Sequence, residues 1–315
     1  MLSRVADALY WMGRYVERAE NITRILLVTD DISTEALGLD AELAMSAWKD
    51  LLAIFPAAHI SRDTPPYAPL ALPYLLGFFA DGRNPYSVSY SLRRARQNAR
   101  AVREALTVEV FVALNETFHA VEGWERKPPG DVPGLRDALS ETHRGIFSIV
   151  GAIAHTLPRD EGWKFLRLGE ALERLYRSAY VLYAKLPALL DADAAPGVPL
   201  HHAQWRTLLR ALASLEHFRR MYGARFEPDV VVPFLVFEPE SPRSLRHGAD
   251  TVLRYVEALG DRGGTAVRIV GRLASELRYA DAARVRPSDM PAFLDRVAEQ
   301  AAAVHDAVDA RFFVT

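Results

Sequence analysis

Apolar residues recur along most of the chain at the spacing of one face of an α-helix. Near the N-terminus they occupy positions 2, 5, 9, 12, 16, 19 and 26, and the same period returns at 165, 168, 172, 175, 179, 182 and 186. This period predicts a long amphipathic helix in each segment. Similar patterns predict further helices over 41–55, 87–119, 134–156, 204–221, 243–259, 264–283 and 289–312.

The alternating pattern of half-buried strands is nearly absent, and only VVVPFLVF at 230–237 suggests an extended segment. Three segments rich in Pro or Gly are predicted to be loops: PPYAPLALP at 65–73, KPPGDVPG at 127–134 and PALLDADAAPGVP at 187–199. None resembles a linker between independently moving domains. The pattern therefore predicts a single compact all-α bundle of many helices, with residues 1–315 forming one domain.

Three motifs occur twice, in the same order and at a nearly constant offset. They are MGxxxER at 12–18 with LGxxxER at 168–174, WxxLL at 48–52 with WxxLL at 205–209, and NPxSV at 84–88 with SPxSL at 241–245. The offsets are 156, 157 and 157 residues, which is half the chain. We therefore expect two diverged, duplicated helical halves, 1–157 and 158–315, related by a pseudo-two-fold axis, with helix 9–30 superposing on 165–186 and helix 85–104 on 242–259.

Charge and composition narrow the classes of function. Lys plus Arg number 38 and Asp plus Glu 40, so a net charge of −2 argues against general electrostatic binding to nucleic acid or anionic lipid. The absence of cysteine excludes disulfides, thiolate metal sites and a cysteine nucleophile. Charges are spread through the N-terminal segment, and no apolar run approaches the length of a membrane span, so we expect a cytoplasmic protein with neither a nucleic-acid nor a membrane partner.

The first predicted helix carries polar residues on a face separate from its apolar stripe. Tyr10, Arg14, Glu17, Asn21 and Arg24 share this face, and Glu20 lies at the edge of the stripe. In the second copy Glu173, Arg177 and Tyr180 take the corresponding positions. Two glutamates from symmetric helices could face a common polar interior and couple their titration. The alternative is a row of ordinary ion pairs on a solvated helix face.

A second cluster lies in NPYSVSYSLRRARQNARAVRE at 84–104. Its arginines at 93, 96, 100 and 103 fall on one flank of the predicted helix, beside the apolar stripe. Guanidinium groups in this arrangement suit a phosphate or carboxylate, or pairing with Glu17 and Glu173; a solvated basic face is the alternative. We expect Arg96, Arg100 or Arg103 to contact Glu17, Glu20 or Asn21. Asn84 before Pro85, and Ser241 before Pro242, are expected to cap helices.

Signals for metal or nucleotide chemistry are weak. Glu116-x-x-His119 stands alone, whereas a di-iron bundle needs two such motifs and two further glutamates. There is no G-x-S-x-G elbow, P-loop or glycine-rich dinucleotide fingerprint. We therefore predict no metal site and no cofactor.

The chain resembles the bacterial alpha-E domain family over nearly its whole length. The resemblance is carried, in the family's order, by MLSRVADALYWMGRYVERAEN, NPYSV, ARQNARAVR, RDEGWKFLRLGEALER, WRTLLRAL and SPRSL. It implies an all-helical protein, typically encoded beside an ATP-grasp protein and often beside a transglutaminase-like protease. The family's characteristic polar residues fall on Tyr10, Arg14, Glu17, Arg18, Glu20, Asn21, Asn84, Ser87, Arg96, Asn98, Arg100, Arg103, Glu173, Arg174, Arg243 and Ser244.

One departure from the family pattern is Gln97, which stands where ARENAR is usual and cannot act as a carboxylate base or metal ligand. Two hypotheses follow. In the first, the protein is a component of an amide- or peptide-bond-forming system, acts with an ATP-grasp ligase and binds an anionic or peptide substrate in an Arg/Glu-lined cavity. In the second, it is itself an amide or peptide transferase or hydrolase, with Glu17 or Glu173 as general base. A closed pocket uniting Glu17, Glu173 and Arg100 would favour catalysis, whereas an open ridge would favour a protein interface.

Overall fold

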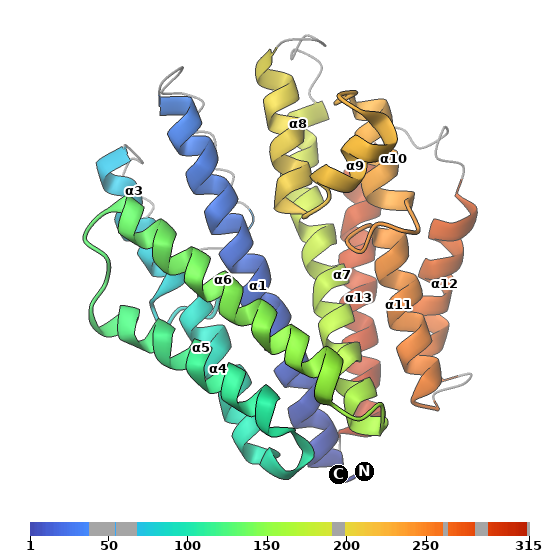
Figure 1. Ribbon diagram of the computed structural model, residues 1–315. Helices are drawn as coiled ribbons and strands as arrows, with labels where there is room; N and C mark the ends of the chain where they lie inside the picture. Colours follow the sequence, from blue (N-terminus) through green and yellow to red (C-terminus); the bar gives the residue numbers. More distant parts are fainter. Residues whose placement is uncertain (38–53, 55–67, 191–198, 261–263, 281–288, 314–315) are drawn as a thin grey trace. The chain divides into compact units, whose positions relative to one another are not determined.

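The computed structural model describes residues 1–37, 54, 68–190, 199–260, 264–280 and 289–313. All regular secondary structure in these residues is helical, which confirms the predicted all-α class (Figure 1). The chain forms two compact units, Met1–Glu170 and Ala171–Thr315. The division falls inside the helix α7 (Glu161–Leu190), whereas the repeat expected from the sequence divides between residues 157 and 158.

The first unit is built around its N-terminal helix. Among the described helices, α1 packs against α3, α4 and α6, while α5 packs against α4 and α6 (Figure 1). The helices of this unit are α1 (Ser3–Leu37), α3 (Ala68–Phe79), α4 (Val88–Ala101), the 3₁₀ turn η1 (Arg103–Ala105), α5 (Val108–Arg126), α6 (Val132–Thr156) and the beginning of α7.

Two glycines let α1 approach the first residues of α7 at backbone distance. A Cβ added to Gly13 would lie 2.1 Å from the carbonyl oxygen of Leu166, and one added to Gly169 would lie 2.0 Å from that of Tyr10. No side chain fits at either place, because real Cβ atoms do not approach backbone so closely. The glycines of the two MG/LG motifs therefore set this helix crossing.

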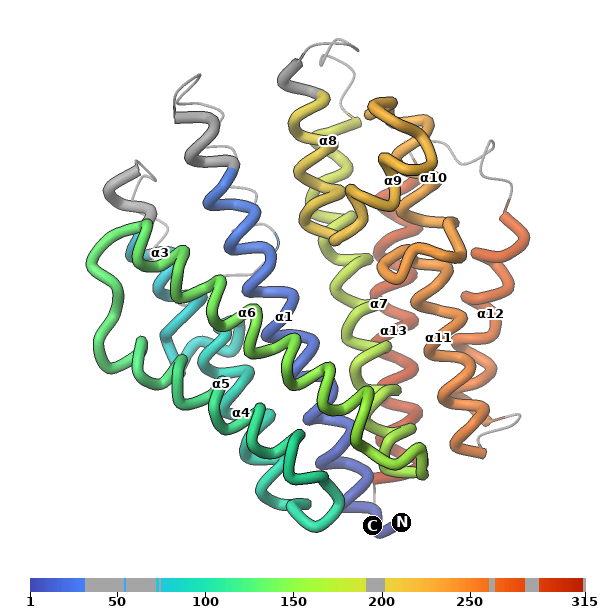
Figure 2. The backbone as a smooth tube through the Cα atoms, viewed as in Figure 1, coloured from blue at the N-terminus to red at the C-terminus, as the bar shows by residue number. Residues whose placement is uncertain are grey.

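In its described residues, the second unit contains the remainder of α7 and six further helices. Helices α11, α12 and α13 follow one another, α12 packing against both of its neighbours, and α10 packs against α9, α11 and α12 (Figure 2). Leu175 of α7 lies against Gly248 of α11. The six helices are α8 (Pro199–Ala211), α9 (Leu215–Tyr222), α10 (Pro228–Phe237), α11 (Leu245–Ala258), α12 (Thr265–Tyr279) and α13 (Met290–Phe312).

Two helices predicted to be continuous are broken. The segment 87–119 divides into α4, η1 and α5, because the Thr107 side chain accepts a hydrogen bond from the backbone N–H of Val110 and starts a new helix. The segment 204–221 divides into α8 and α9 at Ala213, whose φ of 48° lies in the left-handed region. The helical spacing of apolar residues continues across both breaks, so the sequence pattern alone does not predict them.

The predicted extended segment 230–237 is wrong, since these residues lie in α10. The helix has Pro228 in its first turn, and Val231 donates its backbone N–H to the carbonyl of Glu227 at 2.9 Å. Val231, Phe234 and Leu235 are all buried. A β-branched run is compatible with a helix when packing surrounds it, because tertiary burial overrides propensity.

The predicted loops are shorter than their proline content suggested. Helix α3 begins at Ala68 and continues through Pro73, α7 continues through Pro187 to Leu190, and α6 begins at Val132 after the Asp131 cap. The expected helix 41–55, apart from Ile54, lies outside the described residues, as does the first WxxLL motif with Trp48.

Candidate functional site

The polar face of α1 is buried. Tyr10 and Asn21 are 0% exposed, Glu17 3%, Arg24 6% and Arg14 9%. The solvated-face alternative is therefore wrong for this helix, and the charges have to be satisfied by interactions inside the protein. Asn21 stands out, because neither atom of its amide has a hydrogen-bond partner among the described residues.

Glu20 receives its positive partner from its own helix. Arg24 Nε donates to Glu20 Oε1 at 3.0 Å, and His143 Nε2 of α6 lies 3.4 Å from the same oxygen. The carboxylate is thus held between a guanidinium one turn away and an imidazole on the neighbouring helix. One turn separates residues i and i+4, so this pairing needs no contribution from α4.

A second ion pair joins α1 to α6 near the end of the described part of the polar face. Arg136 Nε donates to Asp30 Oδ2 at 2.7 Å. Burial raises the pKa of Asp30, and the hydrogen bond and positive charge of Arg136 oppose this rise without cancelling it. The same hydrogen bond raises the pKa of Arg136. Sequence analysis did not single out either residue, because they lie far apart in the chain.

Arg93 and Arg96 of α4 and Arg103 of η1 contact residues of α5. Arg93 Nη2 donates to Glu125 at 2.7 Å, and Arg96 Nε donates to Asn115 at 2.6 Å. The guanidinium of Arg96 also lies 4.7 Å from the ring centre of Phe118, and that of Arg103 4.4 Å from the ring centre of Phe111. The row is therefore partly held by aromatic rings and amide groups of α5.

The predicted contact between this arginine row and α1 is wrong. In the described part of the chain, Arg96, Arg100 and Arg103 make no hydrogen bond or ion pair to Glu17, Glu20 or Asn21; Arg103 instead donates to the carbonyl of Leu106 at 3.2 Å, and Arg100 is exposed. The apolar stripe of α4, which includes Leu92, Ala95 and Ala99, occupies the buried contact and leaves the arginine flank turned to α5 and solvent.

Other residues of α4 also lie away from the buried face. Asn98 is half-buried, and Gln97 is exposed and accepts a hydrogen bond from Arg94 at 3.1 Å. The departure at Gln97 therefore leaves the buried polar face of α1 unaltered. Arg18 of α1 and Arg94 of α4 both lie over the ring of Tyr15, at 5.2 and 5.8 Å from its centre.

A serine caps the helix at the start of both α4 and α11. The capping residue of α4 is Ser87, and not Asn84 as expected: its hydroxyl donates to the Asp81 carbonyl at 2.6 Å and accepts from Tyr90 N–H at 3.0 Å. Asn84 donates to the carbonyl of Gly77 at 2.8 Å. Both side chains thus hold the turn before α4, and their substrate-binding role stays a prediction.

The corresponding turn before α11 is capped in the same way. The hydroxyl of Ser244, rather than that of Ser241, donates to the carbonyl of Glu238 at 2.5 Å and accepts from the backbone N–H of His247 at 3.1 Å. Ser244 is consequently structural as well. Its neighbour Arg243 is buried.

Helix α7 repeats the buried pairing of charges seen in α1. Glu173 is 0% exposed, and Arg177 Nε donates to its Oε1 at 3.0 Å. Earlier in the helix Arg167 donates to Glu170 at 2.5 Å, while Arg174 is half-buried. Glu17 and Glu173 belong to different units. Their shared interior and their role as general bases stay predictions.

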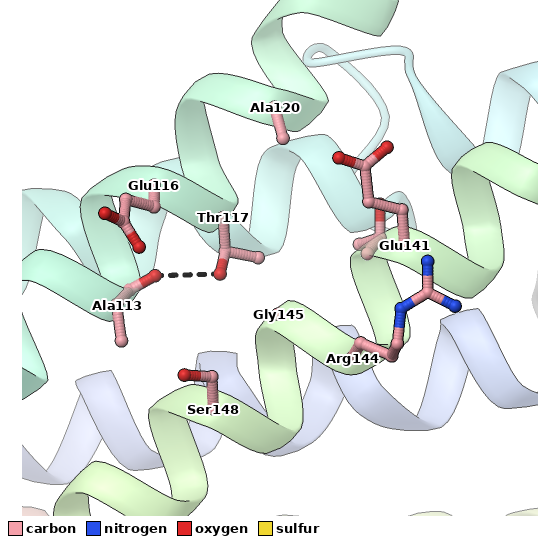
Figure 3. A pocket seen from close by; sticks show the side chains of 9 residues that line it. Ala113, Glu116, Thr117, Ala120, Glu141, Arg144, Gly145 and Ser148 are labelled. Carbon is pink, nitrogen blue, oxygen red and sulfur yellow. Dashed lines mark hydrogen bonds between the residues drawn. The ribbon is translucent and has the colours of Figure 1, made fainter.

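A pocket of about 340 Å³ lies between α5 and α6 (Figure 3). Small side chains leave the space open, and Thr117, whose hydroxyl donates to the Ala113 carbonyl at 2.8 Å, lies at its centre. Sequence analysis noted Glu116 only as part of a Glu-x-x-His pair. The small residues Ala113 and Ala120 of α5 and Gly145 of α6 are the feature of the sequence that could have predicted this pocket. The pocket residues are Ala113, Glu116, Thr117, Ala120, Glu141, Thr142, Arg144, Gly145 and Ser148.

The described residues offer neither a metal site nor a membrane span. Nowhere in the described part of the chain do three His, Asp or Glu side chains lie close enough together to bind one metal ion. His119 instead lies 3.2 Å from Glu122, whose pKa is lowered chiefly by this hydrogen bond. No described helix has both the length and the apolar character needed to cross a membrane.

Comparison with known proteins identifies relatives along the entire chain. A family model for a predicted alpha-helical domain with a conserved ER motif matches residues 1–313. The Glu-Arg dipeptide occurs here at 17–18, 125–126 and 173–174. Uncharacterized proteins of Mycobacterium bovis and Mycobacterium tuberculosis are 27% identical over 320 residues, covering 96% of this chain but 35% of each relative. No solved structure matches the chain significantly.

Proposed function

Because the chain belongs to the alpha-E family, we propose that it is the helical component of an amide- or peptide-bond-forming system and acts with an ATP-grasp ligase. The ligase activates a carboxylate, and the alpha-E protein docks onto it and binds an anionic substrate or acceptor. The ATP-grasp partner and the amide chemistry rest on the family resemblance.

The observation that carries the partnership is the length of the relatives. This chain spans about a third of each mycobacterial protein that it matches. In those proteins the alpha-E region is therefore covalently joined to a much longer polypeptide. A domain that functions beside further domains in one protein commonly needs the same kind of partner elsewhere, so we infer that this chain works as part of an assembly.

The exposed surface of α4 and α5 supports docking. Arg100 is exposed, and on α5 Val108 is 60% exposed and Val112 43%. Arginine is enriched at protein interfaces, where its guanidinium pairs with carboxylates while exposed apolar side chains become buried. Arg100 thus lies on an open surface and not in a closed pocket with Glu17, the arrangement that favours a protein interface.

The internal duplication forms part of the same proposal. Helices α4 and α11 begin at residues 88 and 245, and α5 and α12 at 108 and 265, so both pairs are 157 residues apart. Gly13 lies against the Leu166 carbonyl and Gly169 against the Tyr10 carbonyl, and residues 10 and 166, like 13 and 169, differ by 156. Such reciprocal contacts are typical of a two-fold relation.

The test is reconstitution with the ATP-grasp protein. The two proteins are co-expressed and purified, and their products with ATP and candidate carboxylates and amines are identified by mass spectrometry. We expect a stable complex and an ATP-dependent amide product that the ATP-grasp protein alone makes slowly or not at all. Equal product formation with and without the alpha-E chain, together with no complex, would contradict the proposal.

A further inference from the structure

The pocket between α5 and α6 combines opposite charges that no other side chain uses. Among the described residues, Glu116, Glu141 and Arg144 make no side-chain hydrogen bond or ion pair, and Figure 3 shows one hydrogen bond within the pocket, from Thr117 to Ala113. All three side chains are exposed, as are those of Arg100 and Glu109 elsewhere in this unit. The charges of the pocket are therefore available to a ligand.

The two helices present these charges from different sides. Glu116 comes from α5, whereas Glu141 and Arg144 come from α6, on the other side of Thr117 (Figure 3). Ser148 adds a hydroxyl from α6 that makes no side-chain hydrogen bond within the described residues. A ligand lying between the helices would thus meet a carboxylate at one end, and a carboxylate with a guanidinium at the other.

The pocket is small and is kept open by the sequence. A Cβ at Gly145 would lie 2.6 Å from the Thr117 hydroxyl, so α5 and α6 already touch at this point. Beside this contact Ala113 and Ala120 leave a volume of about 340 Å³. Pockets for small molecules begin at about 300 Å³, so this one accommodates a ligand of amino-acid size.

We propose that this pocket binds a diamino carboxylic acid of the lysine type. At neutral pH such a molecule carries two ammonium groups and one carboxylate. The ammonium groups complement Glu116 and Glu141, and the carboxylate complements Arg144, whose planar guanidinium binds carboxylates in a two-pronged geometry. Each charge of the pocket then has an opposite charge on the ligand. This assignment is independent of the ATP-grasp partnership.

L-lysine is the probe for the test, and two analogues each remove one charge. L-norleucine lacks the side-chain ammonium group, and cadaverine lacks the carboxylate. We expect titration of the whole chain with L-lysine, followed by NMR, to give saturable shifts at residues 113–120 and 141–148. We expect both analogues to bind about two- to five-fold more weakly, because each lacks one charge complementary to the exposed groups of the pocket and an exposed ion pair contributes on this scale.

Variants of the pocket test its residues. Glu116→Gln, Glu141→Gln and Arg144→Gln should each weaken L-lysine binding about two- to five-fold, the scale of an exposed ion pair. Ala120→Phe, which fills the pocket without changing charge, should abolish binding. Glu109→Gln is the matched control, because Glu109 is an exposed carboxylate of α5 that does not line the pocket. Circular dichroism verifies that each variant is folded.

Three results would overturn the proposal. They are the absence of saturable shifts with millimolar L-lysine, equal binding of L-norleucine, and equal weakening by Glu109→Gln and Glu116→Gln. The outcome does not depend on the ATP-grasp protein, which is absent from every arm. Absence of L-lysine binding would therefore not contradict the proposed ATP-grasp partnership. Absence of that partnership would likewise not contradict L-lysine binding in the pocket.

Discussion

Individual buried side chains explain why α1 combines apolar and charged positions. Glu20 interacts with Arg24 and His143, and Asp30 with Arg136. These buried carboxylates therefore have hydrogen-bond partners on α1 and α6 in place of water. Removing one member of such a pair takes a hydrogen-bonded opposite charge away from the buried carboxylate, which is destabilising. The polar face is accordingly as dependent on its neighbours as the apolar stripe.

The titration of Asp30 gives a prediction for the dependence of stability on pH. Burial raises its pKa above the value of 3.8 that the unfolded chain has. Between these two pKa values the folded protein binds more protons than the unfolded protein, so the stability contributed by this group is present below pH 3.8 and is lost as pH rises through the raised pKa. Urea unfolding at a series of pH values should show the parent losing stability relative to Asp30→Asn over this interval.

The exposed Asp137 of the same region provides the control. Asp137→Asn removes an exposed carboxyl near Arg136 and leaves the hydrogen bond between Arg136 and Asp30 in place, so it separates the loss of a nearby negative charge from the loss of the buried one. If the parent gained stability relative to Asp30→Asn with rising pH, the pairing with Arg136 would outweigh burial, and the assigned cause would be wrong.

Glycine contacts give a second prediction at the scale of single residues. Gly13→Ala places a methyl group 2.1 Å from the Leu166 carbonyl, so we expect a loss of about 1–3 kcal/mol in the free energy of unfolding, the usual cost of overpacking. Gly151→Ala in α6 meets nothing within 4 Å and should be neutral or stabilise the helix by up to about 1 kcal/mol. Chemical denaturation compares the two; equal effects would exclude the close crossing.

At the scale of elements, the turns before α4 and α11 use one device. Each capping serine donates to the carbonyl six residues earlier and accepts the N–H three residues later. The hydroxyl therefore both starts the helix and closes the preceding turn. This dual use explains why a proline and a serine recur at the same spacing in both halves of the chain.

Loss of either cap should destabilise its own unit. We expect Ser87→Ala and Ser244→Ala each to lower the free energy of unfolding by about 1 kcal/mol, the typical cost of losing a helix cap. Ser148→Ala, at an exposed hydroxyl, is the control and should have little effect. Hydrogen exchange should show faster exchange at the start of α4 for the first variant and of α11 for the second. An identical pattern in both would argue against local capping.

At the scale of the whole molecule, Arg100 connects the fold to the proposed assembly. We expect Arg100→Ala to leave folding stability within about 0.5 kcal/mol of the parent, because the side chain is exposed. It should weaken association with the ATP-grasp protein by about 2 kcal/mol, a scale typical of a charged contact that is desolvated in a complex. Arg100→Lys should restore the effect only in part, since it keeps the charge but not the planar geometry.

Calorimetric titration of the purified partners measures this effect. Arg83→Ala serves as the control, because Arg83 is a similarly exposed arginine that pairs with Asp81 before α4 begins. Equal affinities for the parent and for folded Arg100→Ala would contradict this role and would indicate that Arg100 belongs to an ordinary solvated helix face.

The sequence by itself determined the all-α class, the two long helices that carry the Glu-Arg motifs and the approximate extent of α6, α11, α12 and α13. Helical periodicity is a local property of the chain, and so it is readable without neighbours. Glu17 and Glu173 are each buried, and the interior that they were expected to share stays a prediction.

Only the tertiary structure decided where each charged flank points and where helices break. The arginines of α4 lie beside its apolar stripe, and which neighbour they meet depends on how α1 and α5 pack around that stripe. The breaks at Thr107 and Ala213, the helical form of α10 and the pocket beside Gly145 likewise arise from capping, backbone geometry and contacts between helices. These are long-range packing choices, and several arrangements of the same faces satisfy one local hydrophobic pattern.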